Sequence, residues 1–158
     1  MVRSNDSRRL STAEIAGLPP GLVAAVDVEN VELVAVHSWV SRLAILVGRG
    51  PQIVVRGRRV FWPGLTADMS HDRIAMSLLA HELVHVWQYA KGMTLWRYIW
   101  RERGVYAYRL DGREFTAYGY EQQAAMVEDW ARLNGGLPAR WGEKVDKPAL
   151  EAIVPFLK

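Results

Sequence analysis

The chain has 158 residues, half of them hydrophobic, and a formal net charge of +3, with 20 lysines and arginines against 17 aspartates and glutamates. This composition predicts one folded domain over residues 1–158 and argues against wholesale disorder. The absence of cysteine excludes disulfides and thiolate metal ligands and fits a reducing compartment. The basic residues are dispersed, so the charge favours an ordinary surface and makes nucleic acid an unlikely partner.

Neither a signal peptide nor a membrane span is expected. The first residues lack an uninterrupted apolar run, and no stretch reaches the ~18 apolar residues of a transmembrane helix. The longest apolar candidate, residues 22–47, is interrupted by Asp27, Glu29, Glu32 and Arg42. We therefore expect a cytoplasmic protein with no transmembrane segment, while export as an effector by a route other than Sec stays open.

The first elements are a short helix and a sheet. Ser11 and Glu14 are spaced as in a capping box, which predicts a helix that ends at Pro19-Pro20-Gly21. Apolar runs separated by turn residues then predict four strands. These strands are expected at residues 31–36, 43–47, 52–55 and 59–62. The short loops favour an antiparallel meander.

The hydrophobic pattern then changes to a helical period. Ser70 is a suitable N-cap and Gly92 a suitable C-cap for one long helix between them. Helices are expected at residues 71–90, 93–103 and 119–133, with a short docking helix near 148–154. In the second of them, Trp96, Trp100 and Arg103 share one face, which could form an aromatic lid over a cleft or a membrane-surface face, although packing against the core is favoured.

The stretch SLLAHELVHVWQ, residues 77–88, holds two histidines and a glutamate in an apolar helix. His81 and His85 are four residues apart and project from one helical face, as two ligands of one metal ion must. Glu82 lies about 100° further round, where it can hold a metal-bound water without binding the metal. This is the His-Glu-x-x-His pattern of zinc metallopeptidases. The alternative is two core histidines with hydrogen-bonded neighbours.

A catalytic zinc takes three protein ligands and keeps one position for water. His71 lies ~15 Å before His81 along the same helix, too far to share an ion. His37 stands at the end of a strand and is expected to be structural or at the surface. A downstream carboxylate is therefore the best candidate for the third ligand.

Glu121 is the expected third ligand. It begins the last long helix, where Ala124 and Ala125 allow a close approach to the motif helix. Glu114 stands in an expected loop, and Glu128 lies on the same face of the helix but ~10 Å further along. Both of these glutamates remain alternatives.

HELVH followed by a glutamate on a later helix resembles the gluzincin group of zinc metallopeptidases in minimal form. HELVHVWQ and YGYEQQAAMVEDW are also similar to small bacterial metallopeptidase-like domains, and the resemblance covers about residues 31–133. It implies a zincin-like α+β domain, in which a small antiparallel or mixed sheet packs on the HExxH helix and a second ligand-bearing helix. It also implies one zinc per chain, held by His81, His85 and Glu121, with Glu82 as the base.

The resemblance also places the boundaries of the core. We expect residues 1–10 and 137–158 to be peripheral to the core at 31–133. One position departs from the family pattern, because larger gluzincins carry an aspartate where this chain has Ala125. Another group must then support a ligand histidine. The candidates for that support are Glu128, Asp129, a main-chain carbonyl and Gln88.

The expected function is hydrolysis of peptide bonds in a peptide or protein substrate, with Glu82 as general base. Four tyrosines precede Glu121: Tyr106, Tyr108, Tyr118 and Tyr120. One of them could donate a hydrogen bond to the oxyanion, with Tyr118 or Tyr120 closest in sequence, although ordinary packing explains such tyrosines more simply. Two other classes stay open: a toxin-associated or scaffold domain that binds metal without turnover, and a basic nucleic-acid-binding protein. An intact Glu82 argues against the first, because a structural metal site needs no base. Neither the substrate nor the oligomeric state follows from the sequence.

Overall fold

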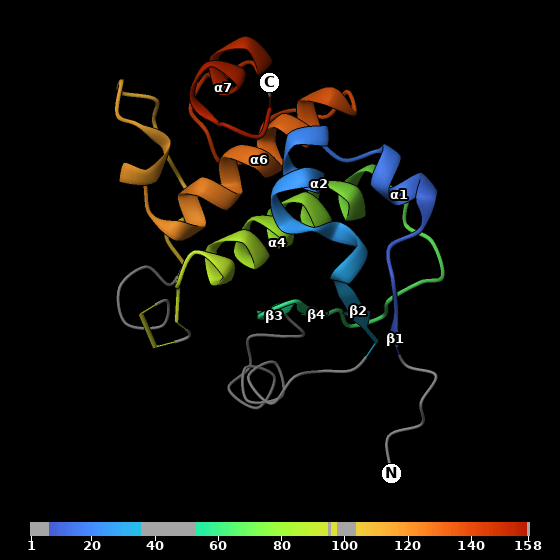
Figure 1. Cartoon of the computed structure of the whole chain (residues 1–158). Helices are drawn as coiled ribbons and strands as arrows, with labels where there is room; N and C mark the ends of the chain where they lie inside the picture. The colour runs from blue at the N-terminus through green and yellow to red at the C-terminus, as the bar shows by residue number, and fades with distance from the viewer. Residues whose placement is uncertain (1–6, 36–52, 95, 98–103, 158) are drawn as a thin grey trace.

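Residues 7–35, 53–94, 96–97 and 104–157 are described by the structure, a computed structural model of the chain (Figure 1). The predicted α+β class is confirmed, with a four-stranded mixed sheet beneath the helices in the view of Figure 1. The helices are α1 (Thr12–Ala16), α2 (Pro20–Val26), α4 (Arg73–Ala90), α6 (Tyr120–Asn134) and α7 (Lys147–Ile153). The strands are β1 (Ser7–Arg8), β2 (Glu32–Val34), β3 (Val54–Arg56) and β4 (Arg59–Phe61), and single 3-10 turns cover Val28–Asn30 (η1) and Phe115–Ala117 (η2).

The sheet has the strand order β1-β2-β4-β3. β3 and β4 form an antiparallel hairpin, whose turn passes through Gly57 at a φ of 61°, which glycine adopts without strain. β2 and β4 run parallel, with Leu33 opposite Val60, so the expected antiparallel meander is wrong. Both of these side chains are fully buried, and burial rather than loop length decides this pair. The strand expected at residues 43–47 lies outside the described residues.

The motif helix α4 begins two residues later than the expected start at residue 71. Asp72 is its N-cap and accepts hydrogen bonds from the main-chain N–H groups of Ile74 and Ala75, whereas the expected cap, Ser70, lies in the preceding turn. Both residue types are good caps, so the sequence does not choose between them. Gly92 follows the helix at a φ of 95°, which suits the end of a helix.

Two helices occupy the segment where one was expected. α1 has the predicted capping box, but Pro20, expected to end it, begins α2 instead, since proline is well suited to a first helical turn. A Cβ atom on Gly21 would lie 2.5 Å from the carbonyl oxygen of Phe156, so α2 packs closely on the C-terminal segment. Gly21→Ala would therefore force these backbones apart.

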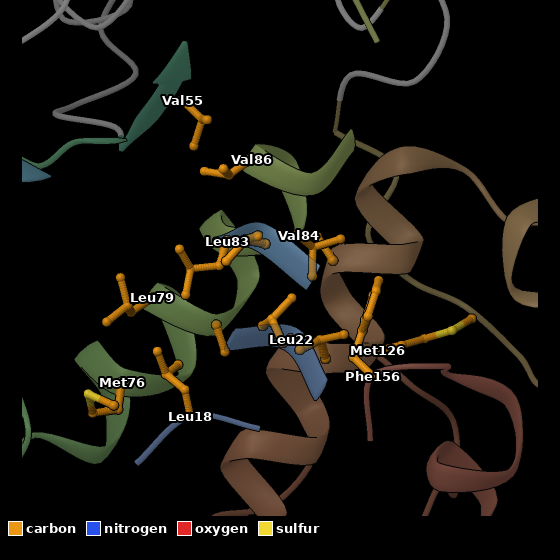
Figure 2. Packing of buried hydrophobic residues seen from close by; sticks show 14 of the residues in the cluster. Leu18, Leu22, Val55, Met76, Leu79, Leu83, Val84, Val86, Met126 and Phe156 are labelled. Atoms are coloured by element: carbon orange, nitrogen blue, oxygen red, sulfur yellow. The ribbon is translucent and has the colours of Figure 1, made fainter. Parts of the chain in front are cut away.

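The hydrophobic core joins α2, α4, α6 and the C-terminal segment. Figure 2 shows Leu22 of α2 between α4, which carries Leu83, and α6, which carries Met126, with Phe156 next to Met126. α4 and α6 make extensive contact, and Ala124 and Ala125 at their interface are fully buried. These small side chains bring the two helices close, which is what the candidate site requires.

The C-terminal residues belong to the same core. Leu150, Val154, Phe156 and Leu157 are all buried in the cluster that surrounds α4. The packed core therefore extends beyond the range 31–133 that was expected.

The aromatic residue expected to pack against the core at the start of the 93–103 helix does not do so. Trp96 is 71% exposed, while Trp100 and Arg103 lie outside the described residues. No described helix combines the length and hydrophobicity that crossing a membrane requires.

Glu14 ties three segments together in the folded chain. This fully buried carboxylate accepts hydrogen bonds from the main-chain N–H groups of Ser11 and Met69, each at 2.8 Å, and from the Arg8 guanidinium at 2.7 and 2.8 Å. Burial raises the pKa of Glu14, but these hydrogen bonds outweigh it and hold the pKa below its usual 4.5. Ionised Glu14 therefore stabilises the fold.

Glu14→Gln should lower the free energy of unfolding by about 2–3 kcal/mol at neutral pH, because an amide cannot satisfy the same donors. Because the pKa of Glu14 is lowered in the folded state, the difference in stability between the variant and the wild type should be largest above pH 4.5. It should shrink as the pH falls through the pKa of folded Glu14. Urea unfolding at neutral pH and in acid measures it. Glu29→Gln, on an exposed carboxylate, is the control, and an equal loss in both variants would contradict this role of Glu14.

Candidate metal centre

Four predicted site residues come together where α4 passes the beginning of α6. His81, Glu82 and His85 lie near the middle of α4, and Glu121 lies in the first turn of α6. All four are buried, and none exposes more than 9% of its surface. The helical repeat directs both histidines from one face of α4 towards α6.

Three of these residues approach one another through single atoms. Glu121 Oε2 lies 3.1 Å from His81 Nε2 and 3.3 Å from His85 Nε2, so one carboxylate oxygen lies close to both imidazoles. One ligand atom from each residue lies within 4.8 Å of the others, a spacing at which the three could hold a metal ion. The imidazole rings meet edge to face, with centroids 5.0 Å apart.

The second nitrogen of each imidazole is held by a hydrogen-bond acceptor. His81 Nδ1 lies 3.0 Å from Glu128 Oε2, and His85 Nδ1 lies 2.7 Å from Gln88 Oε1. The amide of Gln88 is oriented by its Nε2, which donates to the main-chain carbonyl of Tyr120 at 2.9 Å. Both Nδ1 atoms are therefore donors, and both Nε2 atoms can present a lone pair to a metal ion.

The centre concentrates charged groups away from water. Burial lowers the pKa of His81, but hydrogen bonds to Glu121 and Glu128 outweigh it and raise the pKa to about 10. Burial raises the pKa of Glu121, but the two imidazoles outweigh it and hold the pKa far below its usual range. Burial also raises the pKa of Glu82. Three buried carboxylates surround the two imidazoles, so positive charge stabilises the cluster, and a proton or a metal ion can supply that charge.

Of the two carboxylates expected to support a histidine, Glu128 contacts His81 and Asp129 makes other contacts. Adjacent residues of a helix point about 100° apart, so the two side chains have different neighbours. Asp129 is fully buried and accepts hydrogen bonds of 2.6 to 3.3 Å from the main-chain N–H groups of residues 140–142. It also accepts one from the hydroxyl of Tyr108 at 2.9 Å. Asp129 therefore fastens a loop to α6.

Tyr106 lies beside the cluster. Its ring centroid is 5.9 Å from that of His81, and its pKa is raised by burial, by the charge of Glu121 and by a hydrogen bond to that carboxylate. The hydroxyl of Tyr118, one of the two expected oxyanion donors, instead donates to Asp111 at 2.9 Å. Tyr106 lies in an irregular segment, where no periodicity relates sequence distance to position in space, and so closeness in sequence to Glu121 favoured Tyr118 and Tyr120 over it.

Tyr120, the other expected donor, lines a cavity next to the centre. The cavity has a volume of about 160 Å³, and its wall includes Trp87, Gln88 and Gln123. None of the four site residues lines it. The cavity is therefore a neighbour of the candidate metal centre and not part of it.

The remaining candidate ligands do not join the cluster. Glu114 is exposed at the N-terminus of η2, and His71 is exposed in the turn before α4. His37 lies outside the described residues. Of the three carboxylates weighed as third ligand, Glu121 is the one grouped with both histidines.

Comparison with known proteins gives one informative match. No protein-family model and no curated protein matches the chain. Among solved structures, the chain is similar to the effector domain of VgrG2b from Pseudomonas aeruginosa, with a TM-score of 0.63 and 19% sequence identity. The match covers 96% of this chain and 83% of that one. At this identity, the likeness shows a shared fold.

Proposed function

We propose that the chain is a zinc-dependent hydrolase of peptide bonds, with a minimal site of the gluzincin type. The observation that carries the proposal is the meeting of His81, His85 and Glu121 with their ligand atoms within 4.8 Å of one another, next to the buried carboxylate of Glu82. A metal site that serves only stability has no use for such an acid–base group.

The donor set fits zinc. Two ligands on a tetrahedral zinc, with bonds of about 2.0–2.1 Å, lie about 3.3 Å apart. Glu121 Oε2 is 3.1 and 3.3 Å from the two Nε2 atoms. Two imidazoles and one carboxylate are also a usual ligand set of catalytic zinc, which keeps its fourth position for water. We therefore propose one zinc per chain.

Each remaining residue has a role in this proposal. Zinc, when bound, lowers the pKa of water and polarises a substrate carbonyl. Glu82 takes a proton from the attacking water and delivers it to the leaving nitrogen; its raised pKa suits this task. Tyr106, rather than Tyr118, is the hydroxyl placed to stabilise an oxyanion.

A second candidate function is that of a metal-binding, toxin-associated domain without turnover. The fold likeness to a domain described as an effector favours it, and the same likeness is compatible with export. Both candidates use the same three ligands and differ in whether Glu82 works as a base.

Metal analysis and a cleavage assay on the same preparation test the proposal. Protein purified without added metal is analysed for zinc and incubated with a mixed library of quenched fluorescent peptides, with and without a chelator. Bound zinc with chelator-sensitive cleavage supports the hydrolase. Zinc without cleavage favours the second candidate, and a chain that binds no zinc overturns both.

The identity of the third ligand gives a separate prediction. Glu121→Gln should weaken zinc affinity by more than ~10²-fold, because it removes a direct ligand. Glu114→Gln, on an exposed carboxylate outside the cluster, is the matched control and should leave affinity unchanged. Glu128→Gln should fall between them, as the support of His81. Competition with a chromogenic chelator measures all three, and a larger effect at Glu114 or Glu128 would reject Glu121 as the third ligand.

A further inference from the structure

The indole of Trp141 extends the hydrogen-bond chain that begins at His81. Trp141 Nε1 donates to Glu128 Oε2 at 2.8 Å, and the same oxygen lies 3.0 Å from His81 Nδ1. A single carboxylate oxygen therefore accepts hydrogen bonds from both side chains. Glu128 exposes only 1% of its surface, so water has little access to compete for that oxygen.

The position of this indole is set by its own main chain. Asp129, the next residue of α6, accepts the main-chain N–H groups of Trp141, at 3.2 Å, and Gly142, at 2.8 Å. A Cβ atom on Gly142 would lie 2.7 Å from the ring of Tyr108, so the loop also packs tightly there. The loop that carries Trp141 is thus held against the same helix that carries Glu128.

Two side chains pack against the indole. The ring of Tyr106 is stacked on it, with centroids 4.7 Å apart, and the guanidinium of Arg140 lies 4.4 Å from its centroid. Tyr106 in turn lies against His81. The indole has little freedom to rotate, so the direction of its N–H bond is restricted.

We propose that Trp141 is a positioning residue for the metal centre. By holding Glu128 Oε2 in place, it orients His81 with Nε2 towards Glu121, and so it sets the zinc affinity without touching the metal. The inference rests on the proposed zinc site and adds a residue far from the HELVH motif in sequence.

Trp141→Phe tests the inference, because it keeps an aromatic ring beside Tyr106 while it removes the N–H donor together with part of the indole. We expect zinc affinity to fall by about tenfold, within the range seen when outer partners of zinc ligands are lost. Trp130→Phe is a matched control. Trp130 is also half-buried, its Nε1 donates to Glu151 at 2.9 Å, and Lys147 lies 5.2 Å from its ring centroid, but it is not part of this chain of contacts.

Zinc affinity is measured by chelator competition, together with the melting temperature of the metal-free proteins. The two variants should lose similar melting temperature, and only Trp141→Phe should lose affinity. In a Glu128→Ala background, Trp141→Phe should change affinity by less than about twofold, because its route to His81 is gone. If Trp141 only stabilised the fold, the effect of Trp141→Phe on zinc affinity would be the same with and without Glu128.

The outcomes separate this inference from the proposed function. Wild-type protein that binds no zinc overturns both. Wild-type protein that binds zinc, with unchanged affinity in Trp141→Phe or an equal loss in Trp130→Phe, overturns the role of Trp141 alone. The comparison of the two tryptophan variants stands even if the Glu128→Ala protein does not fold.

Discussion

Glu82→Gln should abolish most peptide hydrolysis and leave the zinc in place. The amide matches the carboxylate in shape but cannot accept a proton from water, and general-base catalysis contributes ~10²–10⁴-fold to the rate. Glu82 is not among the three residues whose ligand atoms cluster, so zinc content should stay near one per chain. The two effects are measured on the same sample, by the rate of cleavage of a peptide that the wild type cleaves in the library assay and by metal analysis.

Glu114→Gln controls for the loss of one carboxylate elsewhere, since Glu114 is exposed. Undiminished cleavage by the Glu82→Gln protein would show that this glutamate is not the base. Loss of zinc from it would mean that Glu82 belongs to the metal site itself.

Replacing both His81 and His85 by alanine should remove nearly all bound zinc. Glu121 would then be the one remaining ligand of the three, and a single carboxylate holds zinc weakly. Bound zinc stabilises a fold by about 4 kcal/mol when its free concentration is ~1,000 times its Kd. Added zinc should therefore raise the melting temperature of the wild type and not that of the double variant.

In the absence of metal, the double variant should also have a lower free energy of unfolding than the wild type. Glu121 and Glu128 would be left buried without the imidazoles that hydrogen-bond them. His71→Ala is the matched control, because His71 is exposed and stands outside the cluster. Near-stoichiometric zinc in the double variant would contradict both the proposed function and the proposed role of Trp141.

Local features of this protein follow from the sequence because they depend on a few neighbouring residues. The helical repeat alone puts His81 and His85 on one face of α4, and Ser11 with Glu14 builds the capping box of α1. Where two nearby residues are equally suitable, as Ser70 and Asp72 are for the cap of α4, the predicted start of the helix can be wrong by one or two residues.

Contacts between distant segments were determined only by the tertiary structure. Glu121 is expected near the histidines from ligand count and the small residues after it, but the choice of Glu128 over Asp129 as the partner of His81 depends on the rotation of α6 against α4. Tyr106 and Trp141 come from irregular segments, where no repeat converts sequence spacing into position.

The sheet and the core show the same division. The β3–β4 hairpin is local and was predicted, whereas the parallel pairing of β2 with β4 joins segments that the loops do not constrain. Likewise, Pro20 begins a helix, and Phe156 joins the core because the C-terminal segment packs on Gly21. Spacing along the chain determines which side chains share a face, while the burial of apolar surface across the whole domain determines which faces meet.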